Sequence, residues 1–212
     1  AGHRFSFIIR PTSTFEAEHY IVRPKDVARL AIPPKGNLSE LIGGQVIVHL
    51  YENWKNGSSA IREGSVAAFD GNTALKTPDA LAPVVVFEPA AREAVQGVSA
   101  TRDKLLIDIM QNVKGKVLVA TRAANGSWSH TAMSLPDNVS TNVVGTNPKT
   151  NEAFISVTGF LTPSSIWMAD AARGTASQLK TLAPRFNASN AVVEQMEATS
   201  KDGTKIPYFI VH

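Results

Sequence analysis

The chain has 212 residues, of which 43% are hydrophobic, and a formal net charge of +3. This length suits one all-β domain or two small domains, and no apolar run approaches the roughly 18 residues that a membrane span needs. Lys and Arg are scattered, so the sequence predicts neither a nucleic-acid nor a membrane partner. Cysteine is absent, which excludes disulfides, thiolate metal sites and a cysteine nucleophile and fits the cytoplasm and the bacterial periplasm equally.

Short runs with alternating or β-branched residues recur from end to end. They are Phe5–Arg10, Gln45–Tyr51, Ser65–Asp70, Val84–Glu88, Lys104–Met110, Lys116–Arg122, Val139–Gly145, Ala153–Thr158, Ser165–Ala169 and Val192–Thr199. The turn-forming pairs between them are Asn56-Gly57, Asp70-Gly71, Lys114-Gly115, Asn125-Gly126, Asn147-Pro148 and Asp202-Gly203. Such short strands and frequent turns predict an all-β sandwich, barrel or propeller. Only Asp26–Leu30 and Leu38–Ile42 suggest helix, each one turn at most.

The predicted strands group into units of roughly 45–50 residues, which is the period of four-stranded propeller blades. Ala94–Leu135 is the best-defined unit and Val139–Leu182 is the next. Two less regular units precede them, at about Phe5–Leu41 and Gln45–Pro89. We therefore expect about four blades of a β-propeller within residues 1–185.

The last segment predicts a β-hairpin, with Asp202-Gly203 at the turn because Gly adopts positive φ without steric cost. An isolated hairpin is marginally stable in water, so this one needs a sheet to join.

Several strings towards the end of the chain are similar to the domain junction of the prolyl oligopeptidase family of serine peptidases. The most specific is Ser200-Lys201-Asp202-Gly203-Thr204-Lys205-Ile206-Pro207. Others are Leu179–Leu182, Phe186–Ser189, Val192–Gln195, Phe160–Trp167 and Val86–Pro89. The resemblance implies that Asn142–Leu182 is the last blade of a seven-bladed propeller. It also implies that residues 186–212 are a junction and the first hairpin of a truncated α/β-hydrolase domain.

The resemblance further implies a parent enzyme that hydrolyses short peptides after proline with a Ser-Asp-His triad. Its propeller would filter substrates by size, and its partners would be the peptide substrate and the hydrolase domain of the same chain. The nucleophile of that fold sits in a Gly-x-Ser-x-Gly elbow, with the Asp and His later in the chain. Ser58, Ser65 and Ser127 each follow a glycine but lack the second one. We therefore expect no catalytic residue, no cofactor and no activity from this chain alone.

The histidines suggest no metal site. None of them has the spacing to a second ligand that zinc sites show, and His212 at the end of the chain is not expected to be catalytic. We expect His49, which alternates within an apolar strand, to be half-buried. The five histidines are His3, His19, His49, His130 and His212.

Two carboxylate pairs favour structural roles. Glu194 and Glu197 are three apart on a predicted strand and so point to opposite faces, one to solvent and one to a junction contact. Glu16 and Glu18 are expected in a solvated loop with His19.

The tryptophans and one glycine pair complete the candidates. Trp128 and Trp167 lie in blade strands and are expected to fill the space between blades, whereas Trp54 lies in a turn-rich segment and is expected to be exposed. Ile42–Gln45 contains a glycine pair but lacks the Gly-Lys-Ser/Thr of a phosphate loop, so it predicts a turn.

Two other functions remain open. A self-contained β-propeller or β-sandwich binding module would fit the strand pattern, but it would not be expected to end in a hairpin without a sheet. A free-standing enzyme lacks any nucleophile–base or metal pattern. Blades separated from a larger ring would leave apolar faces open, so we also expect self-association.

Overall fold

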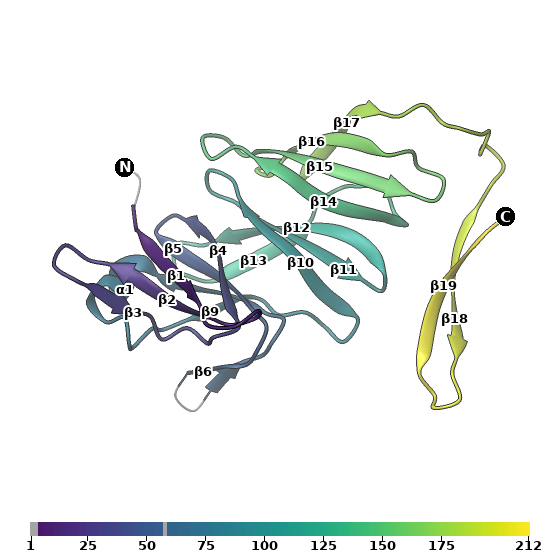
Figure 1. The fold of residues 1–212 in the computed structure, drawn as a ribbon. Helices are drawn as coiled ribbons and strands as arrows, with labels where there is room; N and C mark the ends of the chain where they lie inside the picture. The colour runs from purple at the N-terminus through teal and green to yellow at the C-terminus, as the bar shows by residue number, and fades with distance from the viewer. Residues whose placement is uncertain (1–3, 57–58) are drawn as a thin grey trace.

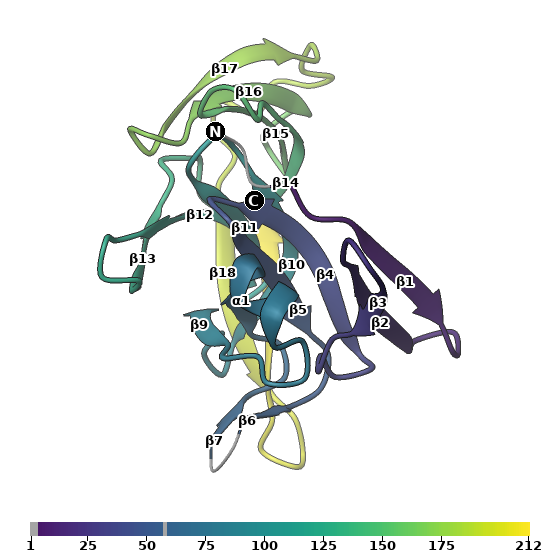
Figure 2. The same ribbon diagram turned by 90° about the vertical axis from the view of Figure 1, so that its left-hand side faces the viewer.

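The computed structural model describes residues 4–56 and 59–212. Four sheets follow one another along the chain, and a separate hairpin comes last (Figures 1 and 2). Each sheet is antiparallel, and its strands lie side by side in chain order. The all-β prediction is therefore confirmed.

The first sheet contains β1 (Phe7–Pro11), β2 (Ala17–Val22) and β3 (Val27–Arg29). The second contains β4 (Gly36–Ile42), β5 (Gln45–Leu50), β8 (Val66–Asp70) and β9 (Val84–Phe87). A small hairpin of β6 (Trp54–Asn56) and β7 (Ser59–Ile61) is inserted between β5 and β8, and α1 (Gly71–Lys76) connects β8 to β9.

The third sheet contains β10 (Glu93–Ala100), β11 (Leu105–Gln111), β12 (Lys114–Arg122) and β13 (Trp128–Ala132). The fourth contains β14 (Val139–Thr146), β15 (Glu152–Gly159), β16 (Ser165–Asp170) and β17 (Thr175–Thr181). These two sheets match the predicted units Ala94–Leu135 and Val139–Leu182. The last hairpin pairs β18 (Val193–Thr199) with β19 (Lys205–Val211), around the predicted turn at Asp202-Gly203.

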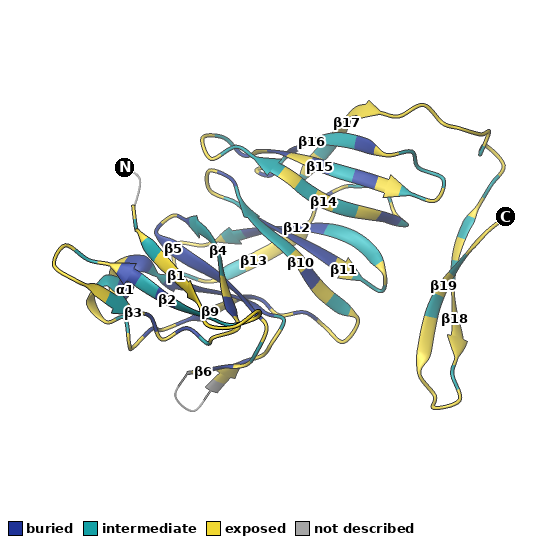
Figure 3. Ribbon diagram, in the orientation of Figure 1, coloured by how far each residue is buried: buried dark blue, intermediate teal, exposed yellow. Residues whose placement is uncertain are grey.

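The core lies between neighbouring sheets rather than within one. On β5, Val46 and Val48 face the first sheet while Ile47 faces the third. On β11, Ile107 faces the second sheet and Leu106 faces the fourth. Side chains alternate between the two faces of a strand, so the middle strands of a stack are buried on both sides. Figure 3 shows this as dark blue in the middle strands and yellow over the closing hairpin.

The first strand of each four-stranded sheet carries a β-bulge against the second strand. The register shifts between Leu38 and Glu40 in β4, and the equivalent shifts occur in β10 and β14. The strand β10 lies against both β4 and β14, so the three bulged strands are neighbours. A bulge increases the local twist of a strand. This shared irregularity is a structural repeat that residue spacing did not indicate.

Several local predictions were wrong. Asp70-Gly71 is not a hairpin turn, because Asp70 caps α1 by accepting a hydrogen bond from the Thr73 amide at 2.7 Å. Asp26–Leu30 and Leu38–Ile42 contain no helix and fall on β3 and β4. The turn expected at Lys114-Gly115 lies two residues earlier, at Asn112-Val113, which both have positive φ.

The predicted boundary between the first two blades was also wrong. The units predicted as about Phe5–Leu41 and Gln45–Pro89 divide instead after β3, because β4 pairs with β5 in the second sheet. The predicted turn glycine Gly57 lies outside the described residues. Among the described residues, no helix is long and apolar enough to cross a membrane.

Candidate functional site

The closing hairpin is docked against the third and fourth sheets. Gln195 on β18 donates a hydrogen bond through Nε2 to the carbonyl oxygen of Asn112 at 2.8 Å. On the same strand, Glu197 forms an ion pair with Arg92. Both side chains are partly exposed, so this pair contributes little to stability. The Gln195 hydrogen bond and this ion pair define the blade–hairpin junction.

Aromatic packing adds to this junction. The rings of Phe160, in the β15–β16 loop, and Phe209 on β19 lie with their centroids 5.2 Å apart. Phe209 and Val113 line a small cavity of about 320 Å³ with residues of the fourth sheet. Val113 has a φ of 60°, which is unfavourable for a β-branched residue. The turn that supports the hairpin is thus held in a strained conformation.

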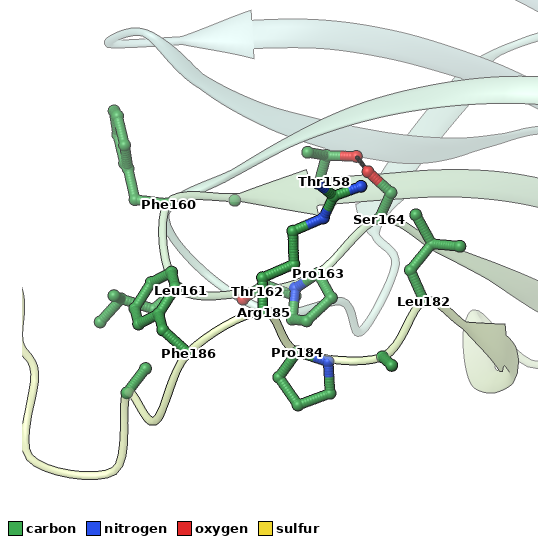
Figure 4. A pocket seen from close by; sticks show the side chains of 13 residues that line it. Thr158, Phe160, Leu161, Thr162, Pro163, Ser164, Leu182, Pro184, Arg185 and Phe186 are labelled. Carbon is green, nitrogen blue, oxygen red and sulfur yellow. Dashed lines mark hydrogen bonds between the residues drawn. The ribbon is translucent and has the colours of Figure 1, made fainter.

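A second cavity, of about 350 Å³, lies where the fourth sheet passes into the chain towards the hairpin. One wall is the β15–β16 loop, residues 158–164, and the other is the segment after β17, residues 182–186 with Ala188. Figure 4 shows Arg185 extending towards Thr158, while Thr158 donates to the Ser164 hydroxyl at 3.1 Å. The cavity can bind an apolar group, but it holds no nucleophile with an adjacent base.

The structure does not bring the predicted histidines together. His19 and His49 are buried, and burial lowers the pKa of both. The ring of His130 packs edge-on against Phe87 with centroids 5.3 Å apart. His212 contacts Glu194 at 3.2 Å, and His3 lies outside the described residues. Within residues 4–56 and 59–212, no three His, Cys, Asp or Glu side chains could together hold a metal ion.

The carboxylate pairs have separate partners. Glu197 makes the predicted junction contact with Arg92, and Glu194 contacts His212 instead. The prediction of a solvated loop for Glu18 was wrong, because Glu18 lies on β2. There it accepts hydrogen bonds from Tyr20 and Arg10, which lower the pKa of its carboxyl.

The tryptophan predictions were right for two of the three residues. Trp128 packs onto the core between the second and third sheets, and Trp167 onto the core between the third and fourth. The exposure predicted for Trp54 was wrong, because its side chain is 4% exposed and packs edge-on against Phe69. The β6–β7 hairpin folds this side chain back onto the first core cluster.

The serines that follow a glycine, and the glycine pair Gly43-Gly44, take no part in a catalytic or phosphate-binding arrangement among the described residues. Ser65 is fully buried immediately before β8, and its hydroxyl has no hydrogen-bond partner. Ser127 lies in a turn, where it donates to Asn125 at 2.7 Å. Ser58 lies outside the described residues. Gly43 and Gly44 form the predicted turn between β4 and β5, both with positive φ.

Sequence reasoning missed Asp108, which joins the third sheet to the fourth. Asp108 is 4% exposed on β11, and its carboxylate accepts hydrogen bonds from the Thr141 hydroxyl at 2.7 Å and the Val143 amide at 3.3 Å. Burial raises the pKa of Asp108 to about 6. The sequence does carry a sign of this contact, because Asp108 is the single charged residue inside the apolar run Leu105–Ile109.

Comparisons with known proteins agree with the fold and the junction. Residues 72–181, just over half of the chain, match the family described as "Prolyl oligopeptidase, N-terminal beta-propeller domain". An uncharacterized peptidase of Sinorhizobium fredii is 33% identical over 183 residues, which cover 86% of this chain and 25% of that protein. An uncharacterized peptidase of Rickettsia prowazekii is 27% identical over 212 residues, with coverages of 97% and 29%.

Solved structures show the same relationship. A post-proline cleaving enzyme from Rickettsia typhi superposes with a TM-score of 0.80 at 27% identity, covering 98% of this chain and 31% of that one. Oligopeptidase B from Trypanosoma brucei, at 14% identity and a TM-score of 0.69 over 98% of this chain and 32% of that one, shows the shared fold.

The sheets are therefore blades of a peptidase-type β-propeller. The chain belongs to the prolyl oligopeptidase N-terminal β-propeller family. It spans between a quarter and a third of the length of these relatives.

Proposed function

We propose that this chain is the propeller part of a serine peptidase that hydrolyses short peptides on the carboxyl side of proline. The observation that carries the proposal is the similarity to the post-proline cleaving enzyme, at 27% identity over nearly the whole chain. In this proposal, residues 1–185 are part of a seven-bladed ring, and residues 186–212 are the junction and the first hairpin of an α/β-hydrolase domain.

The two faces of β19 support this division. Pro207 and Phe209 face the blades side of the strand and are half-buried, and Phe209 packs on Phe160. The alternate residues Ile206, Tyr208 and Ile210 are 51%, 41% and 36% exposed. An apolar strand face without a covering layer is unfavourable in water. A hydrolase domain built onto the hairpin would cover this face.

The contribution of the blades to catalysis is indirect. The hydrolase domain would supply the Ser, Asp and His, while the blades close one side of the space that holds the substrate. The enclosed space would admit flexible peptides and exclude folded proteins. The contacts of Arg92 with Glu197 and of Gln195 with Asn112 would hold the two domains in register.

A cleavage assay with the complete protein tests this function. We expect it to release a fluorophore from a blocked Gly-Pro peptide, and the 212-residue chain alone to release none. The control peptide carries arginine in place of proline, and a folded protein with exposed prolines tests the size filter. Cleavage after arginine but not after proline would contradict the proposed specificity, and equal digestion of the folded protein would contradict gating.

A further inference from the structure

Two cavities lie beside each other along the first three sheets and share no lining residue with the junction cavities. The first, of about 660 Å³, has mainly apolar walls that include Ile9, Pro11, Phe15 and Pro34. The second, of about 750 Å³, is more polar and is lined by segments around Asn53, Arg62 and Pro89. Tyr51 lines both cavities, so the two adjoin at this residue. Each is large enough for a ligand the size of a few amino-acid residues.

The first cavity has aromatic and proline walls together with several polar side chains, including Glu16, Lys35 and Asn37. The side chain of Phe15 is 82% exposed and that of Tyr51 is 58% exposed. His19 also lines this cavity, and its Nδ1 atom is buried without a hydrogen-bond partner. Grooves lined by aromatic side chains are a usual recognition element for proline-rich peptides. This cavity therefore suits a proline or aromatic side chain.

The second cavity is acidic in character. Arg62 is engaged by the Pro89 carbonyl oxygen and by Glu88, whereas the Glu63 carboxylate pairs with no lysine or arginine in the described part of the chain. Glu93, also in its wall, accepts from the Gln111 amide at 2.5 Å. Because burial lowers the pKa of His49, that ring is uncharged at neutral pH and does not offset the carboxylates. A cationic group is the complementary ligand.

The second cavity also reaches the blade–hairpin junction. Ala91 and Glu93 line it, and Arg92 between them holds Glu197 of the closing hairpin. The β6–β7 hairpin and the turn of the β18–β19 hairpin extend to the same side of the molecule in both views (Figures 1 and 2). The second cavity therefore lies next to the contact that the hairpin makes through Arg92.

We propose that these two cavities form one groove that binds an extended peptide, with a proline or aromatic side chain beside Phe15 and a cationic group beside Glu63. Tyr51, whose ring is tilted against that of His49 with centroids 4.4 Å apart, forms the ridge over which the peptide backbone passes. The inference rests on the proposed peptidase function. It assigns a peptide-binding groove to the blades.

Titration calorimetry with the 212-residue chain tests the groove. The probe is a blocked octapeptide with phenylalanine near one end and lysine near the other. We expect saturable binding, which Phe15→Ala weakens about fivefold because an exposed aromatic contact is lost. Glu63→Gln should weaken binding about threefold and reduce its dependence on salt. Both side chains are exposed, so neither change should unfold the chain, and circular dichroism checks this.

The matched control is Phe186→Ala. Phe186 is also an exposed aromatic, 61% exposed, but it lines the junction cavity, so its replacement should leave the affinity unchanged. The absence of saturable binding up to millimolar peptide would overturn the proposal. So would equal weakening by Phe186→Ala and Phe15→Ala, or unchanged affinity in Phe15→Ala.

A second measurement separates this proposal from the peptidase function. In the complete protein, Phe15→Ala should raise KM for peptides that carry both groups and leave kcat unchanged. Cleavage after proline with an unchanged KM would overturn the groove and leave the function standing. Saturable, Phe15-dependent binding without any cleavage after proline would remove the function and leave a peptide-binding surface.

Discussion

Asp108 shows how one residue can make the contact between two blades sensitive to pH. The register places it opposite Gly97, directly after the bulge of β10. The equivalent residues of the second and fourth sheets are Ile47 and Phe154, which pair directly after the bulges of β4 and β14. A carboxyl group thus stands where the neighbouring blades have apolar side chains. The cost of burying its charge explains its raised pKa.

We expect the contribution of Asp108 to the stability of the chain to fall between about pH 4 and pH 7. The pKa of Asp108 is raised to about 6 by burial, so the folded state favours the protonated carboxyl. This stabilisation is complete below the unfolded pKa of about 4 and is lost as pH rises through 6. At about 1.4 kcal/mol for each pKa unit, Asp108 can account for about 3 kcal/mol.

Urea unfolding of wild type and Asp108→Asn at several pH values checks this. The asparagine carbonyl can still accept from Thr141 or Val143, so the variant should fold. Its stability relative to wild type should increase from pH 4 to pH 7. A difference that stays constant over this range would show that Asp108 titrates normally.

At the scale of elements, sheet stacking depends on a glycine. Gly115 on β12 lies directly against β14, where a Cβ atom would come within 2.4 Å of the Thr141 amide nitrogen. Because backbone rather than a flexible side chain stands in the way, the two sheets would have to separate. The contact is close enough that only glycine fits at this position.

We therefore expect Gly115→Ala to destabilise the chain by about 1–3 kcal/mol, the usual cost of overpacking. Gly97→Ala is the matched control, since nothing lies within 4 Å of its Cβ position on β10. That change should alter stability by no more than about 0.5 kcal/mol. Urea denaturation of both variants is the measurement, and equal effects would contradict the close approach of β12 and β14.

The blade boundaries show where strand prediction loses accuracy. Alternation located most strands correctly, because it reports only which side chains face a core. It could not assign Leu38–Ile42 to the second sheet, since that assignment depends on pairing with β5. The docking of Glu197 on Arg92 joins residues 105 positions apart, and no local pattern carries that information.

The whole molecule exposes apolar surface at both ends of its row of sheets. In the first sheet, Ile8 and Ile9 on β1 are 46% and 49% exposed. In the fourth sheet, Met168 and Leu179 are 42% and 58% exposed. Exposed apolar strands at a sheet edge favour association with further chains. This arrangement supports the expectation of self-association through the open blade faces.

We expect the chain to self-associate with increasing concentration, and the double variant Ile8→Lys with Leu179→Lys to remain monomeric over a wider range. Static light scattering across the micromolar range measures this. The control is Val85→Lys, a similarly exposed residue (43%) on the second sheet, which should leave association unchanged. A wild-type chain that stays monomeric at about 100 µM would contradict the expected self-association.

The sequence by itself determined the strands, most turns and the closing hairpin, because alternation and turn chemistry are local properties. It also carried the family resemblance, through strings such as Ser200–Pro207. Only the tertiary structure decided where one blade ends and the next begins, that Trp54 is buried, and that Asp108 bridges two sheets. These depend on which faces meet across long separations in the chain, and contacts of that kind leave no periodic trace in the sequence.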